Sequence, residues 1–114
     1  MTAQSEPEWH LVATIDDVPE EDVIQVVVGD QFFALYNVDG VFFATDDLCT
    51  HEEARLSDGF VIDNIIECPL HQGRFHIPTG TAKGAPVTCN LRTYLVKAEG
   101  NKVYIGLSQL EKIE

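Results

Sequence analysis

Two cysteine–histidine pairs in the middle of the chain constrain its fold more than any other feature. Cys49 and His51 are separated by one residue, Cys68 and His71 by two, and sixteen residues lie between the pairs. Both pairs lie in a stretch from 46 to 90 that is rich in Gly, Pro, Asp and Thr, which favour turns over regular elements. Thiol and imidazole side chains grouped this tightly are typical of a metal site. We therefore expect two loops that hold a metal centre.

The rest of the chain consists of short apolar runs separated by turn residues. Gly29-Asp30 and Asp39-Gly40 are typical of the tight turns of β-hairpins. No run of ten or more residues has a helical period. The pattern predicts an all-β protein with a central insertion that carries the two pairs. The expected strands cover residues 9–14, 24–28, 31–38, 41–45, 60–63, 65–68, 91–98 and 102–107.

Length and charge narrow the class of protein. The chain has 114 residues, enough for one domain, and 45% of them are hydrophobic. Its net charge of −12 argues against binding to nucleic acid or to an anionic membrane surface. The start "MTAQSEPEWH" has neither the basic nor the apolar part of a secretory signal, so we expect a cytoplasmic protein. Three cysteines in such a chain favour metal binding or free thiols over disulfides.

Zinc is the first alternative for two cysteines and two histidines. Structural zinc sites usually pair like with like, in spacings such as C-x2–4-C and H-x3–5-H. Here each pair is mixed and the first spacing is a single residue. The ligand types permit a structural zinc protein, but the spacing fits it poorly.

The pattern C-x-H…C-x-x-H resembles the ligand motif of Rieske [2Fe–2S] proteins. The resemblance continues through "CPLHQGRF", Thr79-Gly80 and "GAP" at 84–86, and covers nearly the whole chain. It implies the Rieske iron–sulfur fold, with an antiparallel, β-sandwich-like basal part and an inserted cluster-binding part. Residues 1–114 would form one domain, with the basal part at about 9–45 and 87–107 and the cluster-binding part at about 46–86.

The resemblance also implies the cofactor and its ligands. One [2Fe–2S] cluster per chain would be bound through Cys49 and Cys68 on one iron and through His51 and His71 on the other. Mixed pairs then make sense, because each loop supplies one ligand to each iron. Neutral imidazoles in place of two thiolates raise the reduction potential relative to an all-cysteine cluster.

Four nearby positions predict where the potential lies in the Rieske range. High-potential Rieske proteins have two further cysteines that form a disulfide, and a Ser and a Tyr hydroxyl bonded to sulfur atoms. The cysteine positions here hold Ala54 and Leu70, and the hydroxyl positions hold Gly73 and Phe75. The resemblance therefore implies a potential near the low end of the range, at about −150 mV.

The segments "FATDDLCTH…ECPLHQGRF" and "APVT" look like the Rieske ferredoxins of bacterial aromatic-ring-hydroxylating dioxygenases, of the naphthalene and biphenyl type. This resemblance implies a monomeric one-electron carrier and not an enzyme. It would take electrons from an NAD(P)H-dependent flavoprotein ferredoxin reductase and pass them to a terminal Rieske non-haem iron oxygenase in aromatic hydrocarbon catabolism. A Rieske ferredoxin of a toluene-type di-iron monooxygenase is the alternative within the same class.

Residues around the predicted ligands carry further expectations. His76 is interpreted as a residue near the ligands or at the surface, and Cys89 as a small buried apolar residue. Arg55 and Arg74 either pair with loop acids or contact partners. Acidic side chains predict a negative rim that either steers partners or is simply solvated: Asp46, Asp47, Glu52, Glu53 and Asp58.

Overall fold

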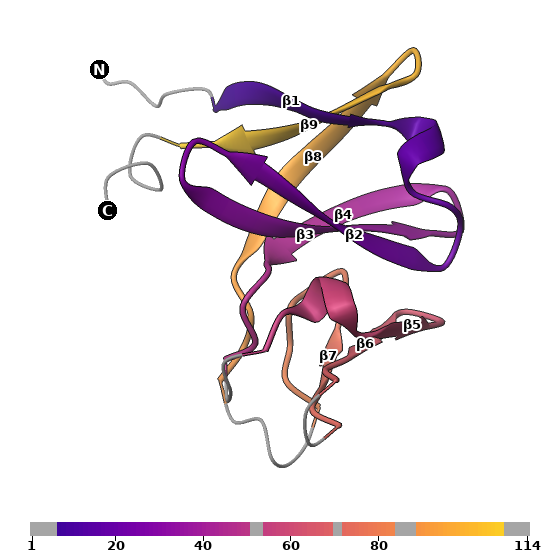
Figure 1. Ribbon diagram of the computed structural model, residues 1–114, viewed down its shortest axis with the longest axis vertical. Helices are drawn as coiled ribbons and strands as arrows, with labels where there is room; N and C mark the ends of the chain where they lie inside the picture. The colour runs from indigo at the N-terminus through magenta and orange to yellow at the C-terminus, as the bar shows by residue number, and fades with distance from the viewer. Residues whose placement is uncertain (1–6, 51–53, 70–71, 84–88, 109–114) are drawn as a thin grey trace.

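The computed structural model describes residues 7–50, 54–69, 72–83 and 89–108. These residues form strands and two short 3-10 turns, with no α-helix among them. The strands make two antiparallel sheets, and the smaller sheet lies below the larger one in Figure 1. The all-β prediction is therefore confirmed. No helix in the described ranges is long and apolar enough to span a bilayer.

The larger sheet has the strand order β1-β9-β8-β4-β3-β2. Two-residue turns join β2 to β3, β3 to β4 and β8 to β9. In the turn between β3 and β4, Asp39 and Gly40 adopt φ angles of 56° and 83°. Such left-handed turns match the twist of the strands they connect. Each strand of this sheet was predicted to within two residues at either end. The strands are β1 (Glu8–Thr14), β2 (Asp22–Val28), β3 (Gln31–Val38), β4 (Val41–Asp46), β8 (Thr93–Glu99) and β9 (Lys102–Leu107).

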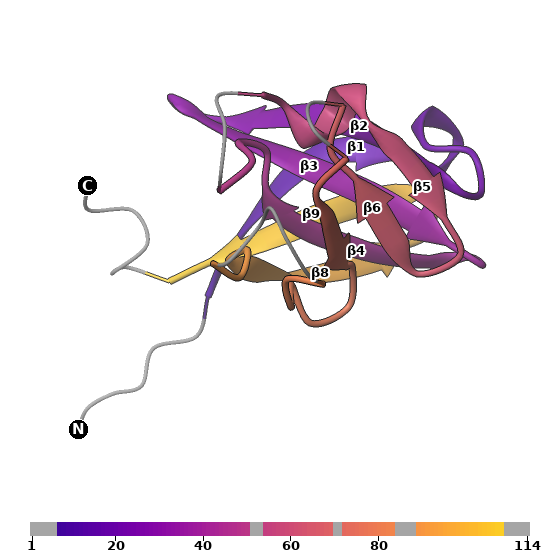
Figure 2. The same ribbon diagram turned by 90° about the horizontal axis from the view of Figure 1, so that it is seen from below.

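The smaller sheet lies between β4 and β8 in the chain. It contains β5 (Phe60–Ile62), β6 (Ile65–Glu67) and β7 (Arg74–His76), and a 3-10 turn at Leu56–Asp58 precedes it. Strand β7 was not predicted, because three residues beside a glycine show no alternation. It forms because β6 pairs with it, with Ile66 opposite Phe75. Seen from below, the smaller sheet lies over the larger one (Figure 2).

Strand β3 joins the two layers, because its alternate side chains enter two different cores. Phe33 and Leu35 belong to the core enclosed by the larger sheet. Ala34, Tyr36 and Val38 belong to a second core on the opposite face, which the smaller sheet and its loops complete. Burial of each large apolar side chain contributes about 1.5–3 kcal/mol. The second core therefore anchors the loop region to a strand that is already fixed in the larger sheet.

Candidate metal centre

The first cysteine lies at the start of a loop that follows β4. Leu48 and Arg55 form an antiparallel bridge, and the next residue on each side closes the loop. The backbone N–H of Cys49 donates to the carbonyl of Ala54 at 2.8 Å. Cys49 is therefore held at the base of a short loop, between the end of β4 and the 3-10 turn at Leu56–Asp58.

The second cysteine lies at the start of the loop that joins β6 to β7. The N–H of Cys68 donates to the carbonyl of Gly73 at 2.7 Å. The adjacent residues Glu67 and Arg74 lie opposite each other in the β6–β7 ladder. Their side chains form an ion pair, with the Arg74 Nε 3.2 Å from the Glu67 Oε1. Gln72 adopts a left-handed φ of 59°, which turns the chain back toward β7. The smaller sheet thus holds Cys68 at the end of its central strand.

The two loops are closed in the same way. In "CTHEEA" and in "CPLHQG", the first residue is a cysteine whose N–H bonds to the carbonyl of the sixth residue. His51 and His71 fall inside these loops in the sequence, but both lie outside the residues that the structure describes. The two loops therefore place Cys49 and Cys68 at equivalent positions. The four-residue ligand set stays a prediction.

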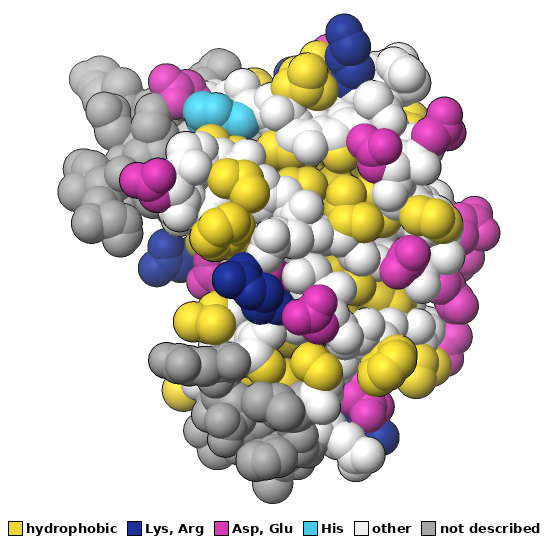
Figure 3. Space-filling view, in the orientation of Figure 1, with side chains coloured by type: hydrophobic (Ala, Val, Ile, Leu, Met, Phe, Trp, Pro, Cys, Tyr) yellow, Lys and Arg dark blue, Asp and Glu magenta, His cyan; other side chains and the backbone are white. Residues whose placement is uncertain are grey.

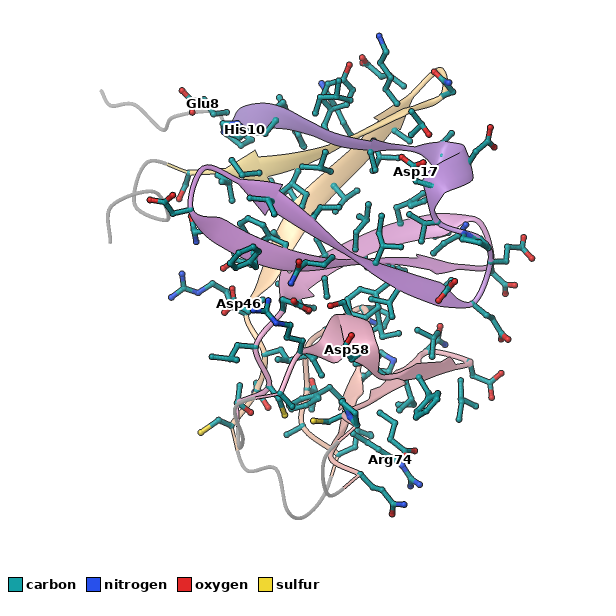
Figure 4. The ribbon with its side chains drawn as sticks, viewed as in Figure 1. Glu8, His10, Asp17, Asp46, Asp58 and Arg74 are labelled. Atoms are coloured by element: carbon teal, nitrogen blue, oxygen red, sulfur yellow. The ribbon has the colours of Figure 1, made fainter. Side chains whose placement is uncertain are left out.

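Both cysteines are buried in the second core. Cys49 is 4% exposed and Cys68 is 1% exposed, and they share one apolar cluster with Ala54, Phe75 and Leu91. The sulfur atoms drawn in Figure 4 all lie in the lower part of the molecule, below the larger sheet. Burying a thiolate without a compensating charge is costly. Two buried cysteines therefore suit thiolate ligands whose charge a metal neutralises.

The described part of the chain contains only half of the predicted ligand set. No group of three or more His, Cys, Asp or Glu side chains gathers within it. All three cysteines are described and none is in a disulfide. Phe75, where high-potential Rieske proteins have a hydroxyl, is completely buried in the same core as both cysteines. The chemistry of the donor set and its burial fit an iron–sulfur cluster with thiolate ligands.

Asp47 lies inside the protein and not on the predicted acidic rim. It is 2% exposed and accepts hydrogen bonds from Gln25 and Ser57, with Arg55 3.6 Å away. The prediction of a rim position is wrong for this residue, because its carboxylate is satisfied by these donors. Asp58 is exposed as expected, and Glu52 and Glu53 lie outside the described residues. Figure 3 shows acidic side chains spread over one face, many of them along its right-hand side.

Two tyrosine hydroxyls lie next to the start of the first loop. The Tyr36 hydroxyl is 2.8 Å from the Thr45 Oγ1. Burial raises the pKa of Tyr36 far above its ordinary value; the bond with Thr45 opposes this, and the charges of Asp47, Asp46 and Cys49 add to it. The Tyr94 hydroxyl donates to the Asp46 Oδ1, and burial, followed by this bond, raises the pKa of Tyr94 in the same direction. Both phenols therefore stay neutral.

Cys89 borders the first loop from a third segment. Thr50 donates its hydroxyl hydrogen to the Cys89 carbonyl at 2.9 Å. Cys89 is exposed, so the prediction of a small buried residue is wrong. Its side chain lines a cavity of about 860 Å³ together with Phe32, Leu48, Cys49, Thr50 and Arg55. The bond with Thr50, which is 39 residues earlier in the sequence, holds Cys89 at this position. No local sequence pattern reveals such a contact.

His76 and the two arginines have protein partners. The His76 Nδ1 lies 2.9 Å from the Thr79 Oγ1, which in turn lies 2.8 Å from the Thr81 Oγ1. Arg55 approaches Asp47 and lies over the Phe32 ring, 5.0 Å from its centroid. Of the two alternatives for the arginines, the structure shows pairing with acidic side chains: Arg55 with Asp47, and Arg74 with Glu67 on β6.

Comparisons with known proteins agree with this geometry. The Rieske [2Fe-2S] domain profile matches residues 8–95. The ferredoxin component of the naphthalene 1,2-dioxygenase system of Pseudomonas aeruginosa is 53% identical over 100 residues, which cover 88% of this chain and 96% of that protein. Sphingomonas yanoikuyae B1 ferredoxin superposes with a TM-score of 0.83 at 38% identity, covering 89% of this chain and all of that one (100%).

A second similar structure comes from a complex. One chain in the complex of reduced oxygenase and oxidized ferredoxin in carbazole 1,9a-dioxygenase superposes with a TM-score of 0.82 at 34% identity, over 93% of this chain and 97% of that one. The domain match covers both cysteine loops and argues against the structural zinc alternative. The chain belongs to the Rieske [2Fe–2S] domain family.

Proposed function

We propose that the protein is a one-electron carrier, the ferredoxin component of an aromatic-ring-hydroxylating dioxygenase system. The observation that carries this proposal is the 53% identity to a naphthalene dioxygenase ferredoxin component, over 96% of that protein's length. The two buried cysteine loops support it, because they provide the thiolate half of a cluster site. The similarity to naphthalene-system ferredoxins favours this reading over a di-iron monooxygenase ferredoxin.

The proposed ligands are those that the Rieske motif assigns. Cys49 and Cys68 would bind one iron as thiolates, and His51 and His71 would bind the other through imidazole nitrogens. The bound cluster supplies a reversible one-electron couple. The chain's own part is to present two thiolates from matching loops and to surround them with apolar side chains such as Phe75 and Leu91. In this proposal residues 46–86 are the cluster-binding part of a single domain.

The reduction potential is proposed to lie near the low end of the Rieske range, at about −150 mV. Gly73 and Phe75 support this, because neither can donate a side-chain hydrogen bond to a sulfur atom, and Ala54 and Leu70 leave no cysteines for the disulfide of the high-potential proteins. Hydrogen bonds to cluster sulfur atoms stabilise the more negative, reduced state. A low potential suits a carrier between a reduced flavin and an oxygenase.

Two protein partners complete the proposal. A flavoprotein ferredoxin reductase would reduce the protein, and a terminal Rieske oxygenase would oxidise it. The likeness to a chain from an oxygenase–ferredoxin complex supports the second partner. We propose that the carrier acts as a monomer in the cytoplasm, where it exchanges one partner for the other by diffusion.

A reconstituted electron-transfer assay tests this function. NADH, a naphthalene-system ferredoxin reductase and its terminal oxygenase should turn over substrate only when this protein is added. The His71→Ala variant should give no turnover, and the His76→Ala variant, which changes a histidine that bonds Thr79, should retain it. Turnover by His71→Ala at the rate of the unaltered protein would contradict the ligand assignment. A cluster-loaded protein that supports no turnover would contradict the choice of system.

A further inference from the structure

The buried carboxylate of Asp47 connects three segments of the chain around the first cysteine loop. Its Oδ2 accepts a hydrogen bond from the Gln25 Nε2 on β2 at 2.7 Å and one from the Ser57 Oγ at 3.1 Å. Its Oδ1 accepts the backbone N–H of Ser57 at 2.9 Å. The Arg55 Nη1 lies 3.6 Å from Oδ2. One side chain thus joins the larger sheet to the turn that follows the loop.

The backbone of Asp47 holds the same turn. The N–H of Leu56 donates to the Asp47 carbonyl at 2.6 Å. Asp47 precedes Cys49 by two residues, and the turn at Leu56–Asp58 follows the loop that Cys49 opens. Both ends of the loop are therefore fixed through one residue. A displacement of the Asp47 side chain would move the base of the loop and Cys49 with it.

The chemistry of the network requires a carboxylate. Among the described residues, the groups that hydrogen-bond or ion-pair with the Asp47 side chain are all donors, and an ionised carboxylate is acceptor-only. An Asn of the same shape would turn an NH2 group toward a donor on one side. The half-exposed guanidinium of Arg55 is the cation beside this 2% exposed carboxylate. A buried carboxylate is a costly way to gain stability, because its desolvation offsets most of the attraction.

The negative charge of Asp47 lies in the surroundings of Cys49. Asp47 precedes Cys49 by two residues, and both residues line the same cavity. Buried charges interact more strongly than exposed ones, because solvent and salt screen them less. Asp47 is therefore placed to act on an electron that arrives next to Cys49.

We propose that Asp47 is a positioning residue for the first cysteine loop, and that its buried negative charge lowers the reduction potential of the group that the loop holds. The carboxylate fixes Cys49 relative to the larger sheet through Gln25 and Ser57. This inference rests on the proposed ligand set, in which Cys49 binds iron.

The test compares two variants that each remove one negative charge. Asp47→Asn removes the buried charge, and Asp58→Asn removes an exposed charge from the neighbouring turn. The reduction potential of each purified, cluster-loaded protein is measured by a redox titration followed by electron paramagnetic resonance. We expect the potential to rise in Asp47→Asn by several times the shift in Asp58→Asn. Equal shifts in the two variants, or no shift in Asp47→Asn, would overturn the proposal.

A third variant separates the charge from a general loosening of the loop. Ser57→Ala removes one donor from the Asp47 Oδ2 but keeps the charge. The carboxylate is then less compensated, so the potential should fall, which is the opposite sign to Asp47→Asn. A higher or unchanged reduction potential in Ser57→Ala would overturn the role of the charge. If Asp47→Asn fails to retain a cluster, the potential of Ser57→Ala alone tests the proposal.

The same titration distinguishes this inference from the proposed function. A normal Rieske signal in all variants with indistinguishable potentials would overturn the role of Asp47 and leave the electron carrier intact. The absence of such a signal from the unaltered protein would overturn the ligand assignment and this inference with it.

Discussion

The turns of the larger sheet and the loops that start at Cys49 and Cys68 both reverse the direction of the chain, but they are held in different ways. The Asp39-Gly40 turn reverses the chain between paired strands with two left-handed residues, and its own sequence specifies it. The cysteine loops are longer, and one backbone hydrogen bond closes each of them. Their position depends on distant groups such as Gln25, which is 22 residues from Asp47. The hairpin turns of the larger sheet are thus specified locally, whereas the position of the site depends on contacts between remote segments.

Removing a buried cysteine should separate the two regions most clearly, because it should remove the cluster and leave the larger sheet folded. We expect Cys68→Ala to eliminate the cluster, because Cys68 is one of the two buried cysteines proposed as thiolate ligands, while the larger sheet still folds. Iron and acid-labile sulfide content with far-ultraviolet circular dichroism measures both consequences. Cys89→Ala, at an exposed cysteine, is the matched control and should keep a full cluster. A normal iron content in Cys68→Ala would refute the thiolate assignment.

The second-largest effect is expected from adding a side chain at a tightly packed glycine near the second loop. A Cβ at Gly59 would lie 2.2 Å from the Glu67 carbonyl oxygen, next to Cys68, so Gly59→Ala should destabilise the protein by about 1–3 kcal/mol and hasten cluster loss. Gly29→Ala, in a hairpin turn with a φ of +60° and open space, should cost about 1 kcal/mol and leave the cluster unaffected. Chemical denaturation and the rate of bleaching with a chelator give the two values. Equal bleaching rates in Gly59→Ala and Gly29→Ala would mean that the cluster does not depend on the packing around the second loop more than on the hairpin turns.

Adding a hydroxyl beside the cysteines should change the potential more than the stability. Phe75→Tyr places an O–H in the core that contains Cys49 and Cys68. A new hydrogen bond to a sulfur atom is worth about 0.5–1.5 kcal/mol, which corresponds to a rise of about 20–60 mV for one electron. Protein-film voltammetry measures it. Phe60→Tyr, at a side chain that is 61% exposed on β5, should leave the potential unchanged. A shift of the same size in both would contradict a local cause.

The exposed ion pair at the base of the second loop should matter least. The Arg74 Nε and the Glu67 Oε1 are 3.2 Å apart on β7 and β6, and the arginine side chain is more than half exposed. Exposed pairs of this kind contribute about 0–1 kcal/mol. Arg74→Ala should therefore lower the free energy of unfolding by less than about 1 kcal/mol and keep the cluster. A larger loss in denaturant titrations would show that the guanidinium does more than pair with Glu67.

Sequence reasoning succeeded where local patterns determine the structure and failed where contacts between remote segments do. Short apolar runs between turn residues predicted every strand of the larger sheet, and Cys49 and Cys68 were expected to come together because their spacing matches a ligand motif. The burial of Asp47 and the exposure of Cys89 were missed. Both depend on partners from other segments, Gln25 and Thr50, which no local pattern identifies. Strand β7 was missed because it forms only against β6.

An electron paramagnetic resonance spectrum of the dithionite-reduced protein tests the central claim most directly. Ligation of one iron by two cysteines and of the other by two histidines predicts a rhombic signal whose average g value is below that of an all-cysteine [2Fe–2S] cluster. A colourless protein without a signal, or a signal typical of four cysteine ligands, would contradict the assignment of Cys49, His51, Cys68 and His71.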